Sequence, residues 1–452
     1  MKHIFDHQHI GIWGFGIVGS SALSWLIHHV EKITVLNKGL KPTSFPQDKH
    51  IFYLEQTNEQ SIHDFLNQCD VIIASPGINL AKYTPWHDKF ICEADIIQMY
   101  FHKPVIALTG SLGKTSTTTL LAQTLQLHTP HTVAAGNIGT GMLNLLEDTT
   151  VEQAVLELSS FQLEHTKIFA PKLAIWTNFY ENHLDFHANM HEYFMAKAHI
   201  FLHQKEFQQA LLPIEIFDML MHAGLLKPNM AFFALQKPDT ELLEKLDHHP
   251  IYALTHQRVI KIQNGLTTEL IELPAQLPTF AANVALVSAA LDLLHLDQQY
   301  ILDALASSAM PAHRLEHIAT IRDCKIYNDS KATVWQATWQ AILSFGTQPI
   351  QVFIGGLSKG VDRTPLFKNI MQHPDCTVHL FGQERFKLAE ICKQLSITHT
   401  VFETIDESFI NCINNVSKPS IILFSPSGSS YDQFTNFQAR GDHFTQLVQD
   451  LN

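Results

Sequence analysis

The feature that most constrains this chain is the alternation of short apolar strands with helical patterns along almost its whole length. HIGIWGF, KITVLN and DVIIASPG are typical of strands, and the alternation resumes near residue 103 and again near residue 310. Strands and helices in regular turn predict parallel sheets that are covered by helices. We therefore expect an α/β protein, and 452 residues favour three domains, at 1–102, 103–309 and 310–452. The stretch 204–275 is less regular and predicts short strands and loops.

Composition excludes several classes of function. A net charge of −13 argues against partners such as nucleic acid or an anionic membrane surface. The six cysteines have no redox or zinc spacing, which favours a reducing compartment. The first residues lack the pattern of a signal peptide, and no apolar run approaches a membrane span. We expect a cytoplasmic protein without a membrane partner.

The first glycine turn is G-x-G-x-x-G, formed by Gly14, Gly16 and Gly19 between a strand and a helical pattern. This spacing is typical of a phosphate-binding turn in dinucleotide enzymes. Such enzymes place an acidic residue at the end of the second strand, where this chain has Asn37. The turn therefore predicts a phosphate site, and an oxidoreductase is the weaker of the two readings.

The second glycine turn, GSLGKT from Gly110 to Thr115, joins the strand VIALT to a helix. Successive backbone N–H groups and the helix N-terminus favour a polyphosphate there. Lys114 would reach the terminal phosphates, and the Thr115 hydroxyl would coordinate Mg²⁺. Leu108 stands where the usual spacing of this motif has glycine, so a tight turn with a chance lysine is the alternative.

Several polar residues follow apolar strands, where open α/β sheets place ligand contacts. Glu157 ends the strand EQAVLE, and its carboxylate would suit a metal that bridges phosphates, although a lone glutamate is more often an edge residue. Lys197 lies in an apolar helical pattern, where it would reach solvent or, if buried, lose its proton. In the last third, Asp329, Lys331 and Lys359 follow strands in the same way. Taken singly, they are ordinary surface charges.

These segments, taken in order, resemble the Mur ligase family over essentially the whole chain. The resemblance rests on GFGIVG, TGSLGKTS, GNIG, LELSSFQLE, NFYENHLD, YFMAKAHIF, PAHRLE, NDSKAT, IGGLSKG and SSYDQFTNFQARG. GNIG, LELSSFQLE, NDSKAT and the last pattern are similar to the branch that adds D-glutamate. The shortened second glycine turn is also the form that this family uses.

The resemblance implies a Rossmann-like N-terminal domain, a central P-loop ATPase-type domain, and a Rossmann-like C-terminal domain that closes over ATP. It implies an ATP-dependent ligase that joins D-glutamate to UDP-N-acetylmuramoyl-L-alanine through an acyl phosphate, in peptidoglycan precursor synthesis. It also implies two Mg²⁺ ions and a carbamylated Lys197, and we expect a monomer.

The resemblance carries over to four sets of residues in this chain. Nucleotide positions are Gly110, Ser111, Leu112, Gly113, Lys114, Thr115, Ser116, Asn137, Asn283, Arg314 and Asp329. Metal positions are Thr115, Glu157, His183 and Lys197. Positions for the UDP sugar or D-glutamate are Ile17, Val18, Asn37, Lys38, Ser75, Ser159, Lys331, Thr333, Lys359, Ser430 and Phe437. Catalytic positions are Lys114, His183 and Lys197, and His183 is the nearest candidate for the base that deprotonates the amine.

Some positions depart from the family pattern. Leu112 and Val334 replace asparagines, Ala282 and Leu286 interrupt a His-Asn-x-x-Asn pattern, and Asn37-Lys38 replaces an Asp-Thr pair. Two alternatives follow. One is another amino-acid ligase of the Mur or folylpolyglutamate type, and the other is a nucleotide-binding protein that has lost catalysis.

Overall fold

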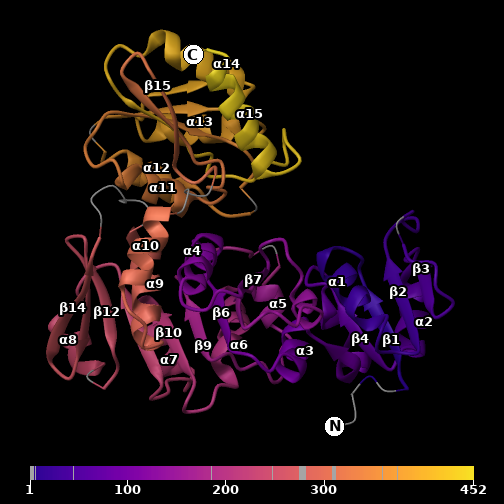
Figure 1. The fold of residues 1–452 in the computed structure, drawn as a ribbon. Helices are drawn as coiled ribbons and strands as arrows, with labels where there is room; N and C mark the ends of the chain where they lie inside the picture. Colours follow the sequence, from indigo (N-terminus) through magenta and orange to yellow (C-terminus); the bar gives the residue numbers. More distant parts are fainter. Residues whose placement is uncertain are drawn as a thin grey trace. The chain divides into compact units, whose positions relative to one another are not determined.

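The computed structural model describes residues 5, 7–43, 45–184, 186–246, 248–273, 281–307, 312–358, 360–373 and 375–451. Within them the chain forms three sheets in sequence order, of five, nine and six strands (Figure 1). The chain divides into two compact units. The amino-terminal unit contains residues 1–179, 191–273 and 283–306, and the carboxy-terminal unit contains 180–190, 274–282 and 307–452.

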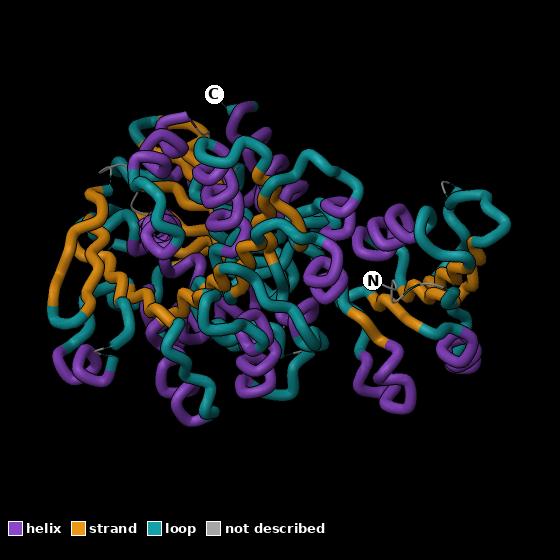
Figure 2. Tube along the Cα trace, turned by 60° about the horizontal axis from the view of Figure 1, so that its bottom comes forward, coloured by secondary structure: helices purple, strands orange, loops and turns teal. Residues whose placement is uncertain are grey.

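The first sheet is parallel throughout, in the order β3-β2-β1-β4-β5. Its strands are β1 (His9–Trp13), β2 (Lys32–Asn37), β3 (Ile51–Glu55), β4 (Val71–Ala74) and β5 (Phe90–Ile91). Its helices are α1 (Ile17–Leu26), α2 (Glu59–Gln68), η1 (Leu80–Lys89) and α3 (Glu93–Tyr100). Helices lie on both faces of these strands in Figure 2. The strand order reverses beside β1, so the first glycine turn opens at the point where such sheets bind ligands.

The second sheet has the order β14-β13-β12-β11-β10-β9-β6-β8-β7, and only β13 and β14 run antiparallel to their neighbours. The parallel strands are β6 (Val105–Thr109), β7 (Thr132–Gly136), β8 (Gln153–Glu157), β9 (Leu173–Trp176), β10 (Gln209–Pro213), β11 (Met230–Ala234) and β12 (Ile251–Thr255). The antiparallel strands are β13 (Arg258–Gln263) and β14 (Leu266–Glu272). The stretch expected to be less regular therefore continues the same sheet.

Helices of the second sheet include short pieces after strands and longer ones that cover the sheet. They are α4 (Lys114–Gln126), η2 (Met142–Leu146), α5 (Ser160–Leu163), α6 (Met190–Leu202), η3 (Ile214–Ile216), α7 (Phe217–His222), α8 (Thr240–Lys245), α9 (Ala281–Leu293) and α10 (Gln299–Ser307). α9 is buried along most of its length, as its nearly continuous apolar sequence predicts. β6, β8 and β9 are adjacent, so the residues that follow them gather at one edge.

The third sheet has the order β15-β16-β20-β17-β18-β19 and is parallel except for β15. Its strands are β15 (Glu316–Ile321), β16 (Cys324–Asn328), β17 (Ile350–Ile354), β18 (Cys376–Leu380), β19 (His399–Val401) and β20 (Ile421–Phe424). Its helices are α11 (Trp335–Leu343), α12 (Thr364–Ile370), α13 (Arg385–Gln394), α14 (Ile405–Asn415) and α15 (Phe437–Gln449). The capping box of Thr404 and Glu407 fixes the start of α14.

The mostly parallel sheets with their helices confirm the α/β fold class. Both units have apolar cores. One buried cluster in the amino-terminal unit joins residues of the first and second sheets, among them Ile10, Ala107 and Trp176. The carboxy-terminal unit has its own clusters, which include Val352 and Phe424. The boundaries at residues 102 and 309 remain a prediction.

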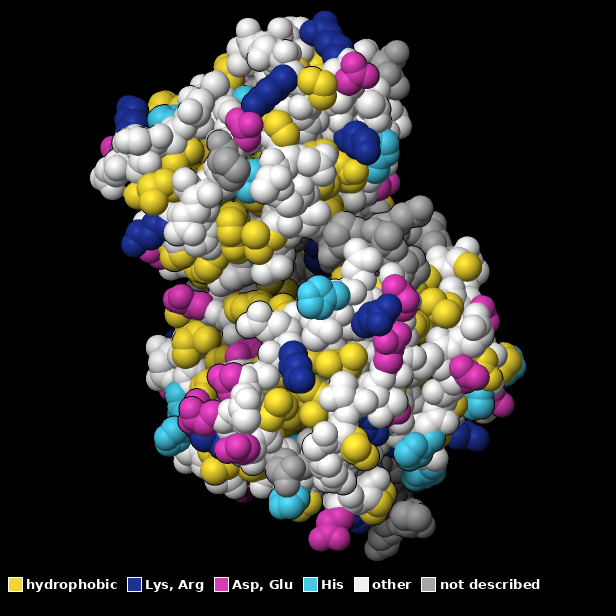
Figure 3. Space-filling model, turned by 90° about the vertical axis from the view of Figure 1, so that its left-hand side faces the viewer, with side chains coloured by type: hydrophobic (Ala, Val, Ile, Leu, Met, Phe, Trp, Pro, Cys, Tyr) yellow, Lys and Arg dark blue, Asp and Glu magenta, His cyan; other side chains and the backbone are white. Residues whose placement is uncertain are grey.

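On the face shown in Figure 3, basic side chains lie singly among acidic side chains and histidines. In the part of the chain that the structure describes, no helix combines the length and the apolar character needed to cross a membrane.

Candidate active site

The second glycine turn forms a backbone cradle at the start of α4. Gly113 precedes the helix with φ +75° and, as a glycine, offers no side-chain cap to the first turn. A Cβ on Gly113 would lie 2.9 Å from Asn283 Nδ2, so the turn requires glycine on both counts. The backbone N–H groups of a helix N-terminus and the helix dipole favour an anion at this point. The loop therefore fits a phosphate, as the sequence predicts for residues 110–116.

The loop is fixed by residues that follow β9. Leu112 donates its N–H to Asn178 Oδ1 at 2.8 Å, and its carbonyl accepts from Asn178 Nδ2 at 3.1 Å and Thr177 Oγ1 at 2.7 Å. From α9, Asn283 Nδ2 donates to Thr117 Oγ1 at 2.8 Å and to the Gly113 carbonyl at 3.3 Å. These bonds hold the backbone of Leu112, so its unusual side chain does not alter the cradle. Leu286, another departure, is buried and fills the core.

Two lysines converge on one carbonyl beneath the loop. Lys114 Nζ donates to the Gly110 carbonyl at 2.8 Å, and Lys197 Nζ donates to the same oxygen at 3.0 Å. Lys197, from α6, is 1% exposed and lies over the Tyr193 ring, 4.6 Å from its centroid. Burial, and then the nearby charge of Lys114, hold the pKa of Lys197 well below its ordinary value. Lys197 is therefore suited to react as a neutral amine.

Glu157, at the end of β8, presents an unsatisfied oxygen. Its Oε1 accepts a hydrogen bond from Asn137 Nδ2 at 3.0 Å. Its Oε2 is buried and has no hydrogen-bond partner among the described residues. Buried polar atoms are nearly always paired, so such an oxygen indicates a missing ligand. A carboxylate oxygen at the edge that carries the phosphate loop fits Mg²⁺.

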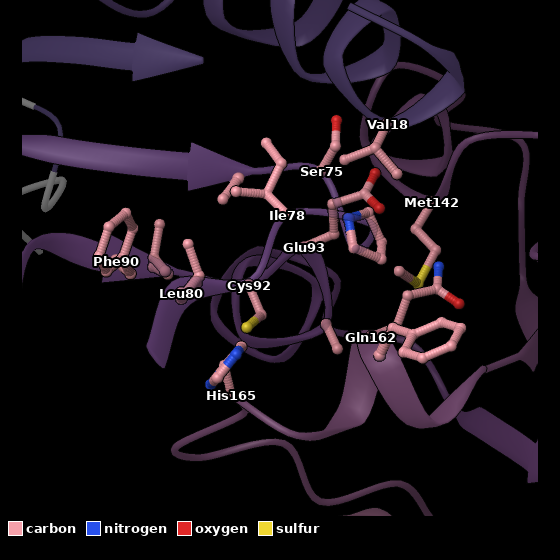
Figure 4. Close-up of a pocket in the computed structure, with 15 residues that line it drawn as sticks. Val18, Ser75, Ile78, Leu80, Phe90, Cys92, Glu93, Met142, Gln162 and His165 are labelled. Carbon is pink, nitrogen blue, oxygen red and sulfur yellow. The ribbon is translucent and has the colours of Figure 1, made fainter. Parts of the chain in front are cut away.

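The first glycine turn has the close packing and the open space that are typical of a phosphate-binding turn. Gly19 packs so closely that a Cβ there would lie 2.0 Å from the Gly14 carbonyl, whereas nothing lies within 4 Å of a Cβ at Gly16. Gly16 thus leaves room for a ligand to approach the backbone. Val18 and Ser75 line a pocket beside this turn, together with Glu93, Gln162 and His165 (Figure 4).

The other residues of the first sheet that the sequence predicts to bind the UDP sugar are placed as follows. Ile17 and Lys38 are exposed, and Asn37 Oδ1 accepts from the Phe15 N–H at 3.1 Å. Ser159 instead forms a capping box with Gln162 at the start of α5, so its side chain is already used in the fold.

In the carboxy-terminal unit, Asp329 lies directly after β16 and is half-buried. Ser425 Oγ donates to its Oδ2 at 2.8 Å, and the Leu315 N–H donates to its Oδ1 at 3.3 Å. Burial raises the pKa of Asp329 to about 7, although both hydrogen bonds and then Arg314 and Arg440 act to lower it. Lys331 Nζ lies 3.9 Å from the centroid of the Phe437 ring, so the structure brings these two predicted substrate positions together.

The remaining predicted residues of this unit are placed as follows. Ser430 is buried and Thr333 is half-buried. The His183 N–H donates to Asn182 Oδ1 at 3.0 Å, in the segment 180–190 that groups with this unit. Lys359 lies outside the described residues. Within the described ranges there is no group of three or more His, Cys, Asp or Glu arranged to hold a metal.

Comparisons with known proteins identify the family of the chain. Residues 108–290 match the family model of the Mur ligase middle domain. A UDP-N-acetylmuramoylalanine–D-glutamate ligase of Bacillus thuringiensis is 32% identical over 391 residues, which cover 84% of this chain and 83% of the relative. The chain belongs to the Mur ligase family.

Solved structures agree with this membership at the level of fold. A pseudomurein peptide ligase type C of Methanothermus fervidus matches with a TM-score of 0.59 at 15% identity, over 99% of this chain and all of that one. A UDP-N-acetylmuramate–alanine ligase of Thermotoga maritima matches with a TM-score of 0.57 at 17% identity and the same coverage.

As a Mur ligase, the protein is an ATP-dependent amino-acid ligase of peptidoglycan synthesis that uses Mg²⁺. The cradle before α4 fits the phosphates of ATP, and the unsatisfied oxygen of Glu157 fits the ion. Its substrates are small molecules.

Sequence reasoning missed residues that act through the backbone. Arg440, buried on α15, donates to the Gly428 carbonyl at 3.0 Å and to the Ser330 carbonyl at 2.7 Å, which ties two ligand-edge loops together. Arg363 acts in a similar way: it donates a hydrogen bond to the Gly355 carbonyl and forms an ion pair with the Glu384 carboxylate. The RG of the terminal pattern was a signal for Arg440, whereas Asn178 had only its place after an apolar strand.

Proposed function

We propose that this Mur ligase adds D-glutamate to UDP-N-acetylmuramoyl-L-alanine. The observation that carries the proposal is 32% identity, over 84% of the chain, to a relative named for D-glutamate addition. The ending SSYDQFTNFQARG, with Ser430 and Phe437, supports the same branch. Lys331 beside the Phe437 ring offers a cation for a substrate carboxylate.

In this proposal the substrates occupy the carboxyl edges of separate sheets. The UDP sugar lies at the first glycine turn, in the pocket of Val18 and Ser75. ATP lies at the start of α4, with Lys114 and the helix N-terminus against its phosphates. Arg314 and Asp329 serve the nucleotide, and Thr333, Lys359, Ser430 and Phe437 serve D-glutamate.

The reaction would proceed in two balanced steps. An oxygen of the L-alanine carboxylate attacks the γ-phosphorus of ATP, the bond to the β-phosphate oxygen breaks, and ADP leaves. The neutral amine of D-glutamate then attacks the acyl phosphate, a C–N bond forms, phosphate leaves, and the amine gives up a proton. Lys114 and the helix N-terminus stabilise the negative charge that develops on the transferred phosphoryl group.

Glu157, Thr115, His183 and Lys197 would hold Mg²⁺, which supplies charge neutralisation to the phosphates. Lys197 fits as a carbamate because its burial favours a neutral amine. That amine can form an N–C bond to CO₂ and release one proton, which leaves an anionic carbamate whose oxygens can act as ligands. Asn137 would orient the Glu157 carboxylate through its hydrogen bond.

An isotope experiment tests this function. UDP-N-acetylmuramoyl-L-alanine labelled with ¹⁸O in its carboxylate is converted with ATP and D-glutamate, and the released phosphate is analysed by mass spectrometry. The proposal expects one ¹⁸O in each phosphate. Label in AMP, or turnover of ATP without a new amide product, would contradict it.

A further inference from the structure

The pocket beside the first glycine turn contains a buried acid that the proposed reaction does not use. Glu93 begins α3 and lines this pocket with Val18 and Ser75. In Figure 4 its carboxyl group points toward the Val18 side chain, and Ser75 lies nearby. Both were predicted from the sequence to contact the UDP sugar, so Glu93 lies where that ligand would bind.

The carboxyl group of Glu93 is incompletely satisfied. The side chain is 5% exposed, and its Oε1 has no hydrogen-bond partner among the described residues. Burial raises the pKa of Glu93 to about 8, and no nearby charge contributes to the shift. Near neutral pH the group is therefore mainly a carboxylic acid, which can donate one hydrogen bond.

A carboxylate in this position would be unfavourable for the expected ligand. The diphosphate of a UDP sugar is anionic, and an ionised Glu93 would repel it in a poorly solvated pocket. A neutral acid, in contrast, can donate to an ester, amide or phosphate oxygen. The pocket thus resembles sites where burial keeps an acid protonated so that it can act as a donor.

The titratable groups around Glu93 do not compensate its charge. On its own helix, Asp95 accepts three backbone N–H groups of residues 167–169, and burial raises the pKa of the Cys92 thiol. After α5, burial and then His87 lower the pKa of His165, so its imidazole is neutral at pH 7. Burial also raises the pKa of Glu164 beside it.

We propose that Glu93 is a substrate-binding residue whose carboxyl group donates a hydrogen bond to an oxygen of the bound UDP-sugar peptide. The inference rests on the proposed function, which assigns this ligand to the pocket. It implies that the affinity for the UDP sugar falls when Glu93 ionises.

The test is calorimetric binding of UDP-N-acetylmuramoyl-L-alanine to the full chain at pH 7 and pH 9. With a pKa of about 8, the protonated fraction of Glu93 falls about tenfold between these values, so the wild-type Kd should rise about tenfold. Glu93→Gln keeps a donor of similar shape and should bind with a Kd that changes little with pH. Glu93→Leu lacks the donor and should bind about tenfold more weakly at pH 7.

Controls separate this inference from the proposed function. Glu31→Gln, at an exposed carboxylate in the same sheet region, should keep the wild-type pH profile. Every variant shares any titration of the ligand itself, so the difference between wild type and Glu93→Gln isolates Glu93. Should Glu93→Leu fail to fold, the pH profile of Glu93→Gln decides alone.

A wild-type protein that binds the ligand, with Glu93→Gln showing the same pH dependence, overturns the role of Glu93 and leaves the proposed function intact. A wild-type protein that does not bind the ligand at either pH overturns both.

Discussion

Asn137 Nδ2 donates a hydrogen bond to Glu157 Oε1 at 3.0 Å and leaves Glu157 Oε2 buried without a partner among the described residues. The amide orients the carboxylate, and the second oxygen is presented at the edge that carries the phosphate loop. This pair gives the clearest sign of a metal ligand in the amino-terminal unit.

Glu157→Gln should weaken the response to Mg²⁺. The variant keeps an oxygen for Asn137 but loses the anionic ligand, so the Mg²⁺ concentration for half-maximal ATP cleavage should rise at least about tenfold. Mg²⁺ titrations of ADP formation measure this, with Glu152→Gln, an exposed residue before the same strand, as control. An unchanged Mg²⁺ requirement would remove Glu157 from the metal site.

Lys197→Ala should reduce the rate at least about 100-fold, because the anionic ligand that its carbamate would supply is lost. Added short carboxylates should restore part of the activity, and Lys197→Arg should remain inactive because a guanidinium does not form a carbamate. Steady-state rates in CO₂-depleted and bicarbonate-supplemented buffer provide a second measurement. Full activity of Lys197→Ala would contradict this role.

Asn178→Ala should raise the KM for ATP about tenfold, because Leu112 loses two backbone hydrogen bonds that shape the cradle. The KM for the UDP sugar should change little, since that ligand is assigned to the first sheet. Steady-state kinetics with each substrate varied in turn measure both values. Equal effects on the two KM values would indicate general loss of structure.

Asp329→Asn should alter how stability depends on pH. The pKa of Asp329 is raised from 3.8 to about 7, so the folded chain keeps a proton that the unfolded chain releases in this window. The contribution of Asp329 to the stability of the folded chain is therefore present below about pH 4 and is lost as the pH rises toward 7. The melting temperature of Asp329→Asn, relative to wild type, should be higher at pH 8 than at pH 4 by at least about 2 °C.

Asp362→Asn serves as a control, because its effect on stability should depend on pH in the opposite direction. Hydrogen bonds from Thr364 lower the pKa of Asp362, so its contribution is present at neutral pH and is lost on acidification. This variant should be less stable than wild type at pH 8, and the difference should diminish toward pH 3. Parallel pH profiles for the two variants would contradict the assignment for Asp329.

The fold was predictable wherever a signal is local. Glycine turns and apolar strands identified β1, β2, β4 and β6, because each pattern lies within about ten residues. β3 and β5 were missed. β5 has only two residues, too few for a strand pattern. β3 carries the apolar run IFYL, from which a strand could have been predicted, although its Phe52 is half-exposed.

The candidate site was predictable in its motif residues and not in its supports. Asn178 acts on a backbone 66 positions away, and Arg440 on one 110 positions away, so no local pattern marks either contact. Glu93 follows a cysteine in an ordinary sequence, and glutamates are mostly exposed. Its burial depends on packing that only the folded chain shows.

The most direct test of the central claim is the amino-acid dependence of ADP formation. Purified protein is assayed with ATP, Mg²⁺ and UDP-N-acetylmuramoyl-L-alanine, with one amino acid of a panel added at a time. The account predicts turnover with D-glutamate and at most a few per cent of that rate with L-glutamate, L-alanine, L-lysine or diaminopimelate. Equal or faster turnover with any of these would contradict it and assign the chain to another branch of the family.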